Sequence, residues 1–255
     1  MSWQEIKSIV KPVKIGVTLS GSELGPQEIV RGAEGVVRDN SSLQVILIGK
    51  ESYGSSLPLI KTDDDLKACH QVMEKLLDSG EIDGAVTLHY DFPLGITTVG
   101  KVITPGRGRE VFISATTGTS AINRVEAMIL NAILGIAIAK AHGITTPSMG
   151  VVNVEGSRLV GKALQELKDR GYHINPGLSL RADGGMVLRG NDLLAGSTDV
   201  MVCDALTGNI LTKMFSAFLT GGDYEGTGYG YGPAAGKGYR RKIGIISRVS
   251  GGTCS

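Results

Sequence analysis

The sequence predicts an α/β protein whose helices cover both faces of a mostly parallel sheet. Short apolar runs that read as buried strands alternate along the whole chain with segments of helical pattern. Apolar residues make up 42% and charged residues 20% of the 255 residues, which is ordinary for a folded protein with a real core. Strands that are apolar without interruption are buried on both faces, as in parallel sheets. We expect one compact α/β unit over residues 1–255, in which two lobes can meet near residue 115.

Caps and glycines delimit the elements of the first half of the chain. Pro26 stands where the first turn of a helix accepts a proline. Thr62 and the three aspartates after it form a helix start with acids in the first turn. The expected order is strand 13–19, helix 28–38, strand 43–48, helix 62–80, strand 85–88 and an irregular connection 90–110 that can form a hairpin.

Glycines end the helices of the second half in the same way. Gly143 and Gly171 each follow a long helical segment, where the left-handed residue of a helix end is usually glycine. The expected order is strand 111–114, helix 121–142, strand 149–152, helix 157–170, strand 198–203, helix 208–219, a glycine-rich loop 221–238 and strand 243–247.

Charge and composition exclude several function classes. The 26 Lys and Arg nearly balance the 25 Asp and Glu, so no basic excess indicates nucleic-acid binding. Cys69, Cys203 and Cys254 are widely spaced and read as free thiols of a reducing compartment. The longest apolar run, 127–139, is too short to span a membrane, and residues 1–11 lack the apolar core of a signal peptide. We expect a cytoplasmic protein that binds neither nucleic acid nor membrane.

Three strand ends share one chemical character. Segments 114–120, 153–157 and 203–209 each place hydroxyl or amide side chains and a glycine before an expected helix, whose free N–H groups can bind an anion. Ligands of parallel sheets bind at the carboxyl ends of the strands. The same residue types also serve merely as helix caps, and that alternative stays open. The predicted anion-binding residues are Ser114, Thr117, Gly118, Thr119, Gly156, Ser157, Thr207, Gly208 and Asn209, and the catalytic candidates are Asn153, Glu155 and Asp204.

The C-terminal segment adds positive charge. From Lys237 onward there are five Lys or Arg residues and no acid, and segment 221–238 before it holds eight glycines in eighteen residues. A flexible cover followed by cations suits a phosphorylated or CoA-like ligand. A solvated loop before a basic edge strand explains the same pattern equally well.

No motif indicates a metal or a nucleotide cofactor. Residues 232–238 depart from a P-loop, and no G-x-G-x-x-G motif occurs. The four histidines lack metal-ligand spacing. We therefore expect no metal and no nicotinamide, and we expect Cys203 to be a packed core residue and His142 to support a helix end.

Three consecutive motifs resemble the C-terminal signature of PlsX-type phosphate acyltransferases: GNDLLAG at 190–196, TDVMVCD at 198–204 and TGNILTK at 207–213. The motif MGVVNVEG at 149–156 is similar to the same group. Phosphotransacetylases and the alpha subunit of component C of glycine reductase are similar over this region, which covers roughly residues 110–220. The motif TSAINRVE at 119–126, together with the glycine- and tyrosine-rich tail, looks most like MtxX, the methanogenesis marker protein 4 family of methane-forming archaea, which is described as a methyltransferase subunit.

The resemblance implies a three-layer α/β/α fold of the isocitrate/isopropylmalate dehydrogenase-like kind, with a site for acyl transfer between phosphate and a thiol carrier. Phosphotransacetylases carry a Ser-Arg pair near the C-terminus and a catalytic acid seven residues after the serine. Ser247 and Arg248 match that pair, and Arg248 would then hold the anionic group of the ligand. The position of the acid is occupied by Cys254, so the reaction itself stays open.

The leading hypothesis is a methanogenesis-associated, phosphotransacetylase/PlsX-like protein that binds phosphate or a thiol ligand resembling CoA or coenzyme M, and that transfers an acyl or methyl group. A second hypothesis is a methyltransferase subunit that acts with partner subunits. A third is a non-catalytic assembly factor for methanogenic enzymes. We expect a homo-oligomer with further methanogenesis proteins as partners, whereas the sequence names neither the substrate nor the partner.

Overall fold

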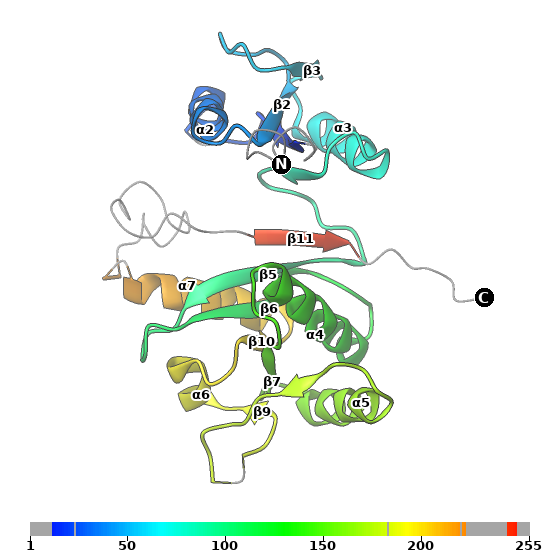
Figure 1. The fold of residues 1–255 in the computed structure, drawn as a ribbon, viewed down its shortest axis with the longest axis vertical. Coiled ribbons are helices and arrows are strands. Elements are labelled where there is room, and N and C mark those ends of the chain that lie inside the picture. Colours follow the sequence, from blue (N-terminus) through cyan, green and yellow to red (C-terminus); the bar gives the residue numbers. More distant parts are fainter. Residues whose placement is uncertain (1–11, 23, 183, 220, 223–243, 249–255) are drawn as a thin grey trace, which may run out of the picture. The chain divides into compact units, whose positions relative to one another are not determined.

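The computed structural model describes residues 12–22, 24–182, 184–219 and 221–222, together with the backbone of 244–248. The chain divides into two units, Met1–Asp91 and Phe92–Ser255, and each is described by itself (Figure 1). This division precedes residue 115, where the sequence analysis placed the meeting of two lobes. The single compact unit over 1–255 stays a prediction.

The first unit is a parallel sheet of four strands in the order β3-β2-β1-β4. Val30 and Ala33 of one helix join a core with Leu47, and Cys69 and Met73 of another helix pack with Ile48. Because Leu47 and Ile48 are consecutive in one strand, the two helices cover opposite faces of this sheet (Figure 1). The elements are β1 Val13–Thr18, α2 Pro26–Asp39, β2 Leu43–Gly49, β3 Leu59–Lys61, α3 Leu66–Asp78 and β4 Gly84–Val86.

Local sequence explains where these helices begin. Pro26 is the first residue of α2, as expected, and its fixed φ suits that position. The Asp65 carboxylate accepts a hydrogen bond from the Ala68 N–H at 3.1 Å and so caps α3.

The second unit contains the order β11-β5-β6-β10-β7-β8, with β9 also paired to β7. β10 runs parallel to both β6 and β7, while β5 runs antiparallel to β6 and β11. Its elements are β5 Ile96–Ile103, β6 Glu110–Thr119, α4 Arg124–Ala141, β7 Ser148–Val152, α5 Ser157–Asp169, β8 Asn175–Pro176, β9 Val187–Leu188, α6 Gly190–Ala195, β10 Val200–Val202, α7 Ala205–Leu219 and β11 Gly244–Arg248.

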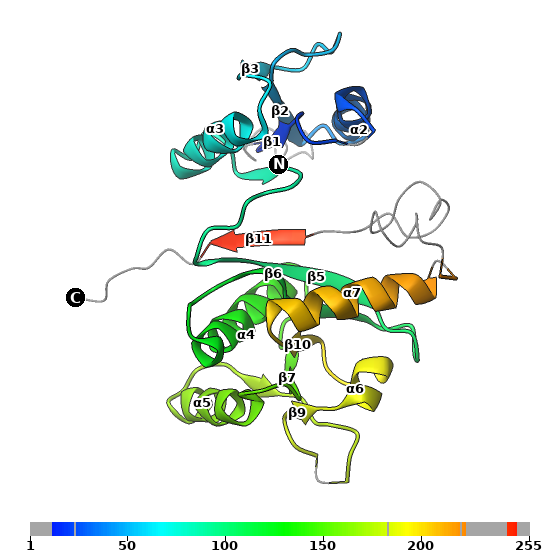
Figure 2. The same cartoon turned by 180° about the vertical axis from the view of Figure 1, so that it is seen from behind.

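Two apolar cores cover the two faces of this sheet. Phe112 and Val200 face one side, where they pack with Met128 of α4 and Val160 of α5. On the other side Ile113 packs with Phe215 of α7. Since neighbouring residues of a strand point to opposite faces, α4 and α7 lie on opposite sides of β6, and α7 is in front of the strands in Figure 2. The predicted three-layer α/β/α class with mostly parallel strands is confirmed.

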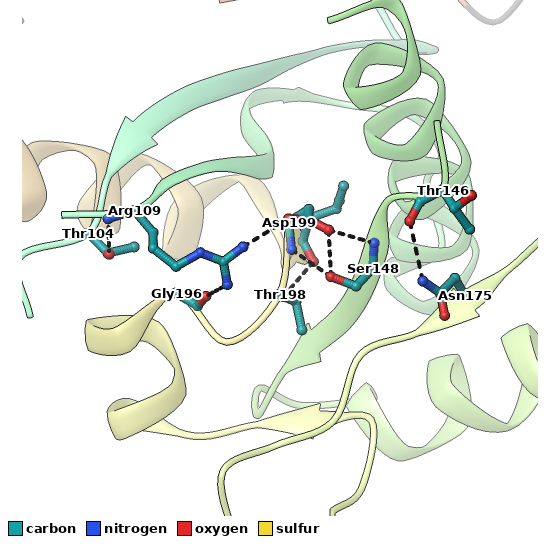
Figure 3. A network of polar contacts seen from close by, with 9 residues as sticks. Thr104, Arg109, Thr146, Ser148, Asn175, Gly196, Thr198 and Asp199 are labelled. Carbon is teal, nitrogen blue, oxygen red and sulfur yellow. Dashed lines mark hydrogen bonds and ion pairs between the residues drawn. The ribbon is translucent and has the colours of Figure 1, made fainter. Parts of the chain in front are cut away.

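The amino ends of three neighbouring strands are joined by one polar network (Figure 3). The Asp199 carboxylate accepts from the Ser148 N–H at 2.8 Å and from its hydroxyl at 2.7 Å, and it pairs with Arg109 at 3.0 Å. Arg109 also donates to the Gly196 carbonyl. Because Arg109, Ser148 and Asp199 stand just before or at the start of β6, β7 and β10, the network aligns these strands.

Several expected element boundaries are wrong at the carboxyl end of the sheet. β6 continues to Thr119 instead of ending at residue 114, because β5 pairs with it as an antiparallel hairpin and supplies hydrogen bonds. The sequence analysis allowed a hairpin within residues 90–110; a hairpin does form there, but its second strand, β6, lies almost entirely beyond that range. α4 begins at Arg124 after the Asn123 cap, and α7 begins at Ala205, three residues before the expected start.

The sequence analysis missed the short elements between residues 175 and 195. β8 and β9 hold two residues each, too few for a periodic pattern. α6 is held by Asp192, which is 1% exposed and accepts from the Arg189 N–H at 2.7 Å, the Leu180 N–H at 2.6 Å and the Ser179 hydroxyl at 2.8 Å. No helix among the described residues is long and apolar enough to cross a bilayer.

Candidate functional site

The three predicted strand ends lie at one edge of the sheet, as expected. In register, Ser114 of β6 stands beside Val202 of β10, and Val202 stands beside Val151 of β7. The strands are parallel, so the segments that follow them emerge on the same side. The sequence reasoning about which loops come together is therefore confirmed.

The Ser247–Arg248 backbone belongs to the same edge. In β11, Ser247 pairs with Thr97 and Arg248 with Ile96. In β6, Gly118 pairs with Thr97 and Thr119 with Ile96. The Ser-Arg pair expected from the resemblance thus ends two strands away from Gly118 and Thr119. Its expected acid position, Cys254, lies outside the described residues.

Arg124 joins two of the strand-end segments. Its Nη1 lies 3.1 Å from Glu155 Oε2, which follows β7, and its Nη2 lies 4.0 Å from Asp204 Oδ1, which follows β10. The sequence analysis did not select Arg124, although it stands in the motif TSAINRVE. The sequence did contain a signal for Arg124, because this arginine directly follows the cap residue Asn123 at the end of a strand-end segment.

Asp204 is the cap of α7. Its Oδ2 accepts from the Thr207 hydroxyl at 2.7 Å and its Oδ1 accepts from the Thr207 N–H at 3.1 Å. Partial burial alone would raise the pKa of this carboxyl, but the Thr207 bonds and the Arg124 charge outweigh it and lower the pKa. Asp204 is therefore a fixed anion that orients Arg124, and it is poorly suited to carry a proton near neutral pH.

Thr207 lies inside α7 with Gly208 and Asn209, so its expected position before the helix is wrong. The Gly208 N–H donates to the Asp204 carbonyl at 3.0 Å, and the Asn209 amide donates to the Thr116 carbonyl at 3.2 Å. A Cβ at Gly208 would lie 1.7 Å from the Ala115 carbonyl oxygen. Gly208 is therefore required for the close approach of α7 to β6, and the Thr207 and Gly208 N–H groups are engaged within the helix start.

Ser114 and Cys203 belong to the core beneath the site. The Ser114 hydroxyl is fully buried and donates to the Asn131 carbonyl at 2.7 Å. The Asn131 amide donates to the Cys203 carbonyl at 3.2 Å and its Oδ1 accepts from Ser120 at 2.6 Å. Burial raises the pKa of the Cys203 thiol, so this thiol is a packed core group, as expected, and not a thiolate nucleophile.

A pocket of about 150 Å³ lies on the α4 face of this edge. It brings together the predicted residues Gly118, Thr119 and Asp204, and Arg124 also lines it. Gly118 has a φ of +76°, and a Cβ there would lie 2.3 Å from the Ile96 carbonyl oxygen, so the hairpin requires glycine at this position. The other lining residues are Ala121, Ile122, Ala127, Met128, Asn131 and Ala205.

The segment after β7 contributes the remaining predicted residues. Asn153 and Glu155 are exposed, and the Glu155 side chain is 88% exposed. Gly156, with a φ of +86°, starts α5 without a side-chain cap, and Ser157 is buried. The uncapped first turn leaves N–H groups without a side-chain partner near Glu155. Whether these residues bind a ligand stays a prediction.

The comparison with known families decides the ancestry of this fold. The family model described as fatty acid synthesis protein matches residues 13–250 of the chain. The chain belongs to this PlsX-like family.

Among the residues that the structure describes, no group of three or more His, Cys, Asp or Glu side chains could hold a metal ion.

Three relatives of this chain carry two kinds of description, a reductase complex subunit and a phosphate acyltransferase. The glycine/sarcosine/betaine reductase complex component C subunit alpha of Peptoclostridium acidaminophilum is 53% identical over 247 residues, which is 97% of this chain and 64% of that protein. The phosphate acyltransferase of Thermotoga petrophila is 27% identical over 230 residues, covering 79% of this chain and 67% of its own. The phosphate acyltransferase of Bacillus cytotoxicus is 24% identical over 241 residues, which cover 79% of this chain and 70% of that protein.

These relatives support the PlsX-like part of the resemblance. They are bacterial proteins, and none of the three is a methanogenesis marker protein. The assignment to the MtxX family and to archaea is therefore not shown.

Proposed function

We propose that this chain transfers an acyl group between phosphate and a thiol, as the alpha-type subunit of a reductase component C. The 53% identity to such a subunit and the membership in a phosphate acyltransferase family support the proposal. The observation that carries it is Arg124, which stands between Glu155 and Asp204 where the parallel strands end.

The Arg124 guanidinium is suited to bind the phosphate of an acyl phosphate. Its side chain is 47% exposed and its partner Glu155 is 88% exposed, so this ion pair is weak and easily displaced. A phosphate oxygen pair can replace the Glu155 carboxylate in a bidentate contact. Asp204, ionised because of its lowered pKa, then keeps the guanidinium in place from the other side.

The transfer step uses groups from the same edge. The thiol sulfur attacks the acyl carbon, a C–S bond forms, and the C–O bond to phosphate breaks so that inorganic phosphate leaves. The thiol proton passes to the Glu155 carboxylate, which the phosphate has displaced from Arg124. The Asn153 amide and the uncapped N–H groups of α5 provide donors for the charge that develops on the acyl oxygen. The predicted role of Arg248 in holding the anionic group concerns a side chain outside the described part of the chain.

The test is thioester formation from acetyl phosphate and coenzyme A by the full chain, alone and with co-purified subunits. We expect Arg124→Ala to lower kcat/KM on the order of a hundredfold, with Arg124→Lys recovering part of it. Arg170→Ala is the control, because Arg170 is an exposed arginine at the other end of α5. Equal rates for the parent and Arg124→Ala would overturn the assignment of this site.

A second candidate rests on the motif TSAINRVE, which contains Arg124 and is shared in the resemblance to MtxX. In that case the chain is a methanogenesis-associated methyltransferase subunit or a non-catalytic assembly factor, and it works with partner subunits in the cytoplasm. A full chain that forms no thioester, with or without co-purified subunits, yet remains bound to methanogenic enzymes supports this candidate. Homo-oligomer formation is part of both proposals and is measured by light scattering.

A further inference from the structure

The pocket beside Arg124 runs from an exposed mouth to a buried end. Ile122 and Arg124 stand at the mouth, where Ile122 is 89% exposed and the Arg124 side chain is 47% exposed. Met128 and Asn131 line the same pocket and are 0% and 2% exposed. A ligand that enters beside the guanidinium therefore leaves solvent as it reaches toward Asn131.

One side of α4 forms the wall between these two ends. Arg124, Ala127, Met128 and Asn131 follow one another at spacings of three and four residues, so they lie on the same side of the helix. Arg124 and Asn131 are separated by about 10 Å along the helix axis. The helix thus places a cation at the mouth of the pocket and an amide at its end.

The wall between the cation and the amide is apolar. Ala127 and Met128 separate the Arg124 guanidinium from the Asn131 amide, and Ala205 adds apolar surface from the start of α7. Burial of one methylene group against such surface strengthens binding about fourfold. An anion at the mouth that carries a short alkyl tail matches this order of charge and apolar surface.

The Asn131 amide makes the buried end polar. Its Oδ1 accepts from the Ser120 hydroxyl at 2.6 Å, and one of its two amide N–H groups donates to the Cys203 carbonyl at 3.2 Å. The second N–H has no acceptor among the residues that the structure describes. An alkyl chain that reached this N–H would seal it from water without offering an acceptor, and this costs free energy. The polar end therefore disfavours a long chain.

The volume of the pocket sets a similar limit. The pocket holds about 150 Å³, and an apolar cavity of about that size accommodates benzene, a molecule of six carbon atoms. A tail of at most about six carbon atoms therefore fits between the mouth and Asn131, whereas a long fatty acyl chain does not.

We infer that Met128 and Asn131 determine the length of the acyl group that this protein accepts, and that they restrict it to short chains. The inference rests on the proposed function, because it takes from there the contact between phosphate and Arg124. It adds the class of acyl group and the residues that select it. The phosphate and the acyl carbon stay at the mouth, and the alkyl tail lies along α4 with its end against Met128.

The test is binding of alkylphosphonates of increasing length, from methyl to octyl, to the full chain by calorimetry. These compounds carry an anion and a tail but no acyl group, so their binding does not depend on the transfer reaction. We expect the affinity to rise about fourfold per methylene while the tail fills the apolar stretch, and to fall once the tail reaches Asn131. Arg124→Ala should weaken binding at every length by about tenfold or more.

Two variants with matched controls locate the limit. Met128→Ala should move the best-bound length to longer tails, and Ala127→Leu should move it to shorter ones. Leu164→Ala is the control for the first, because Leu164 is as buried as Met128 and belongs to the same core but does not line the pocket. Ala137→Leu, at an exposed position of α4, is the control for the second. Neither control should move the best-bound length, and urea midpoints show whether each variant is folded.

The outcomes separate this inference from the proposed function. An affinity that keeps rising to octylphosphonate, a best-bound length that Met128→Ala and Ala127→Leu leave unchanged, or no binding at any length overturns the inference. Octanoyl phosphate that serves the parent as well as acetyl phosphate overturns the length limit but leaves acyl transfer intact. If no thioester forms although both variants shift the best-bound length as expected, acyl transfer fails and the selection of short tails by this pocket stands.

Discussion

Arg124 of α4 and Glu155 after β7 form a 3.1 Å ion pair although 31 residues separate them in the chain. The Glu155 side chain is 88% exposed, so the contact is largely solvated. We expect a double-mutant cycle of Arg124→Ala and Glu155→Ala to give a coupling energy below about 1 kcal/mol in urea unfolding. A coupling of several kcal/mol would show that the pair holds the fold together and is not free to open for a ligand.

The cap of α7 is expected to depend on Asp204. Asp204→Ala removes both bonds to Thr207 and should cost about 1 kcal/mol of unfolding free energy, within a range of about 0.5–2 kcal/mol. Asp204→Asn keeps an acceptor for the Thr207 N–H and should lose less. Equal losses for the two variants would mean that the charge, and not the cap geometry, stabilises the helix start.

The pH dependence of the same carboxylate has a definite sign. Its pKa is lowered in the folded state, so its stabilisation is complete above the unfolded pKa of about 3.9 and is lost as pH falls through the folded value. The stability difference between the parent and Asp204→Asn should therefore be constant near neutral pH and shrink in acid. Urea unfolding at a series of pH values checks this, and a difference that grows in acid would contradict it.

Asp192 is expected to matter more for stability than any exposed carboxylate. Its oxygens accept from Leu180, Arg189 and Ser179, and these bonds lower its pKa although burial acts in the opposite direction. Asp192→Asn places an amide donor against a backbone donor and should cost about 2–3 kcal/mol. Asp169→Asn, on the exposed surface of α5, should change stability by less than about 0.5 kcal/mol. Similar losses in both variants would contradict a specific role of the buried carboxylate.

The contact between α7 and β6 is expected to fail when Gly208 gains a side chain. A Cβ there would overlap the Ala115 carbonyl oxygen, so Gly208→Ala should destabilise the protein by about 3 kcal/mol or more. Gly161 in α5 is the matched control, since its Cβ would meet only Met186 Sδ at 3.9 Å. Gly161→Ala should stabilise the helix by about 0.5–1 kcal/mol. Thermal unfolding measures both, and a tolerated Gly208→Ala would show that α7 can move away from β6.

Elements with a strong local signal were predicted well. The apolar runs of β1, β2 and β7, the proline-started helix α2 and the capped helix α3 lie within a few residues of their expected positions. The alternation of strands and helices was enough to expect parallel strands and to place segments 114–120, 153–157 and 203–209 at one edge. β8 and β9 were missed because two residues carry no periodicity, and they exist only through their pairing with β7.

The sequence by itself determined the α/β class, the strand-end segments and the PlsX-like resemblance, because apolar periodicity, caps and motifs are local properties of the chain. Tertiary structure alone decided that β6 runs on to Thr119, since the hydrogen bonds that extend it come from β5. It also began α7 three residues earlier than expected, which made Thr207 a helix residue, and it selected Arg124, whose partners come from two other strand ends. Such contacts depend on which backbones approach each other, and no spacing along one segment specifies that.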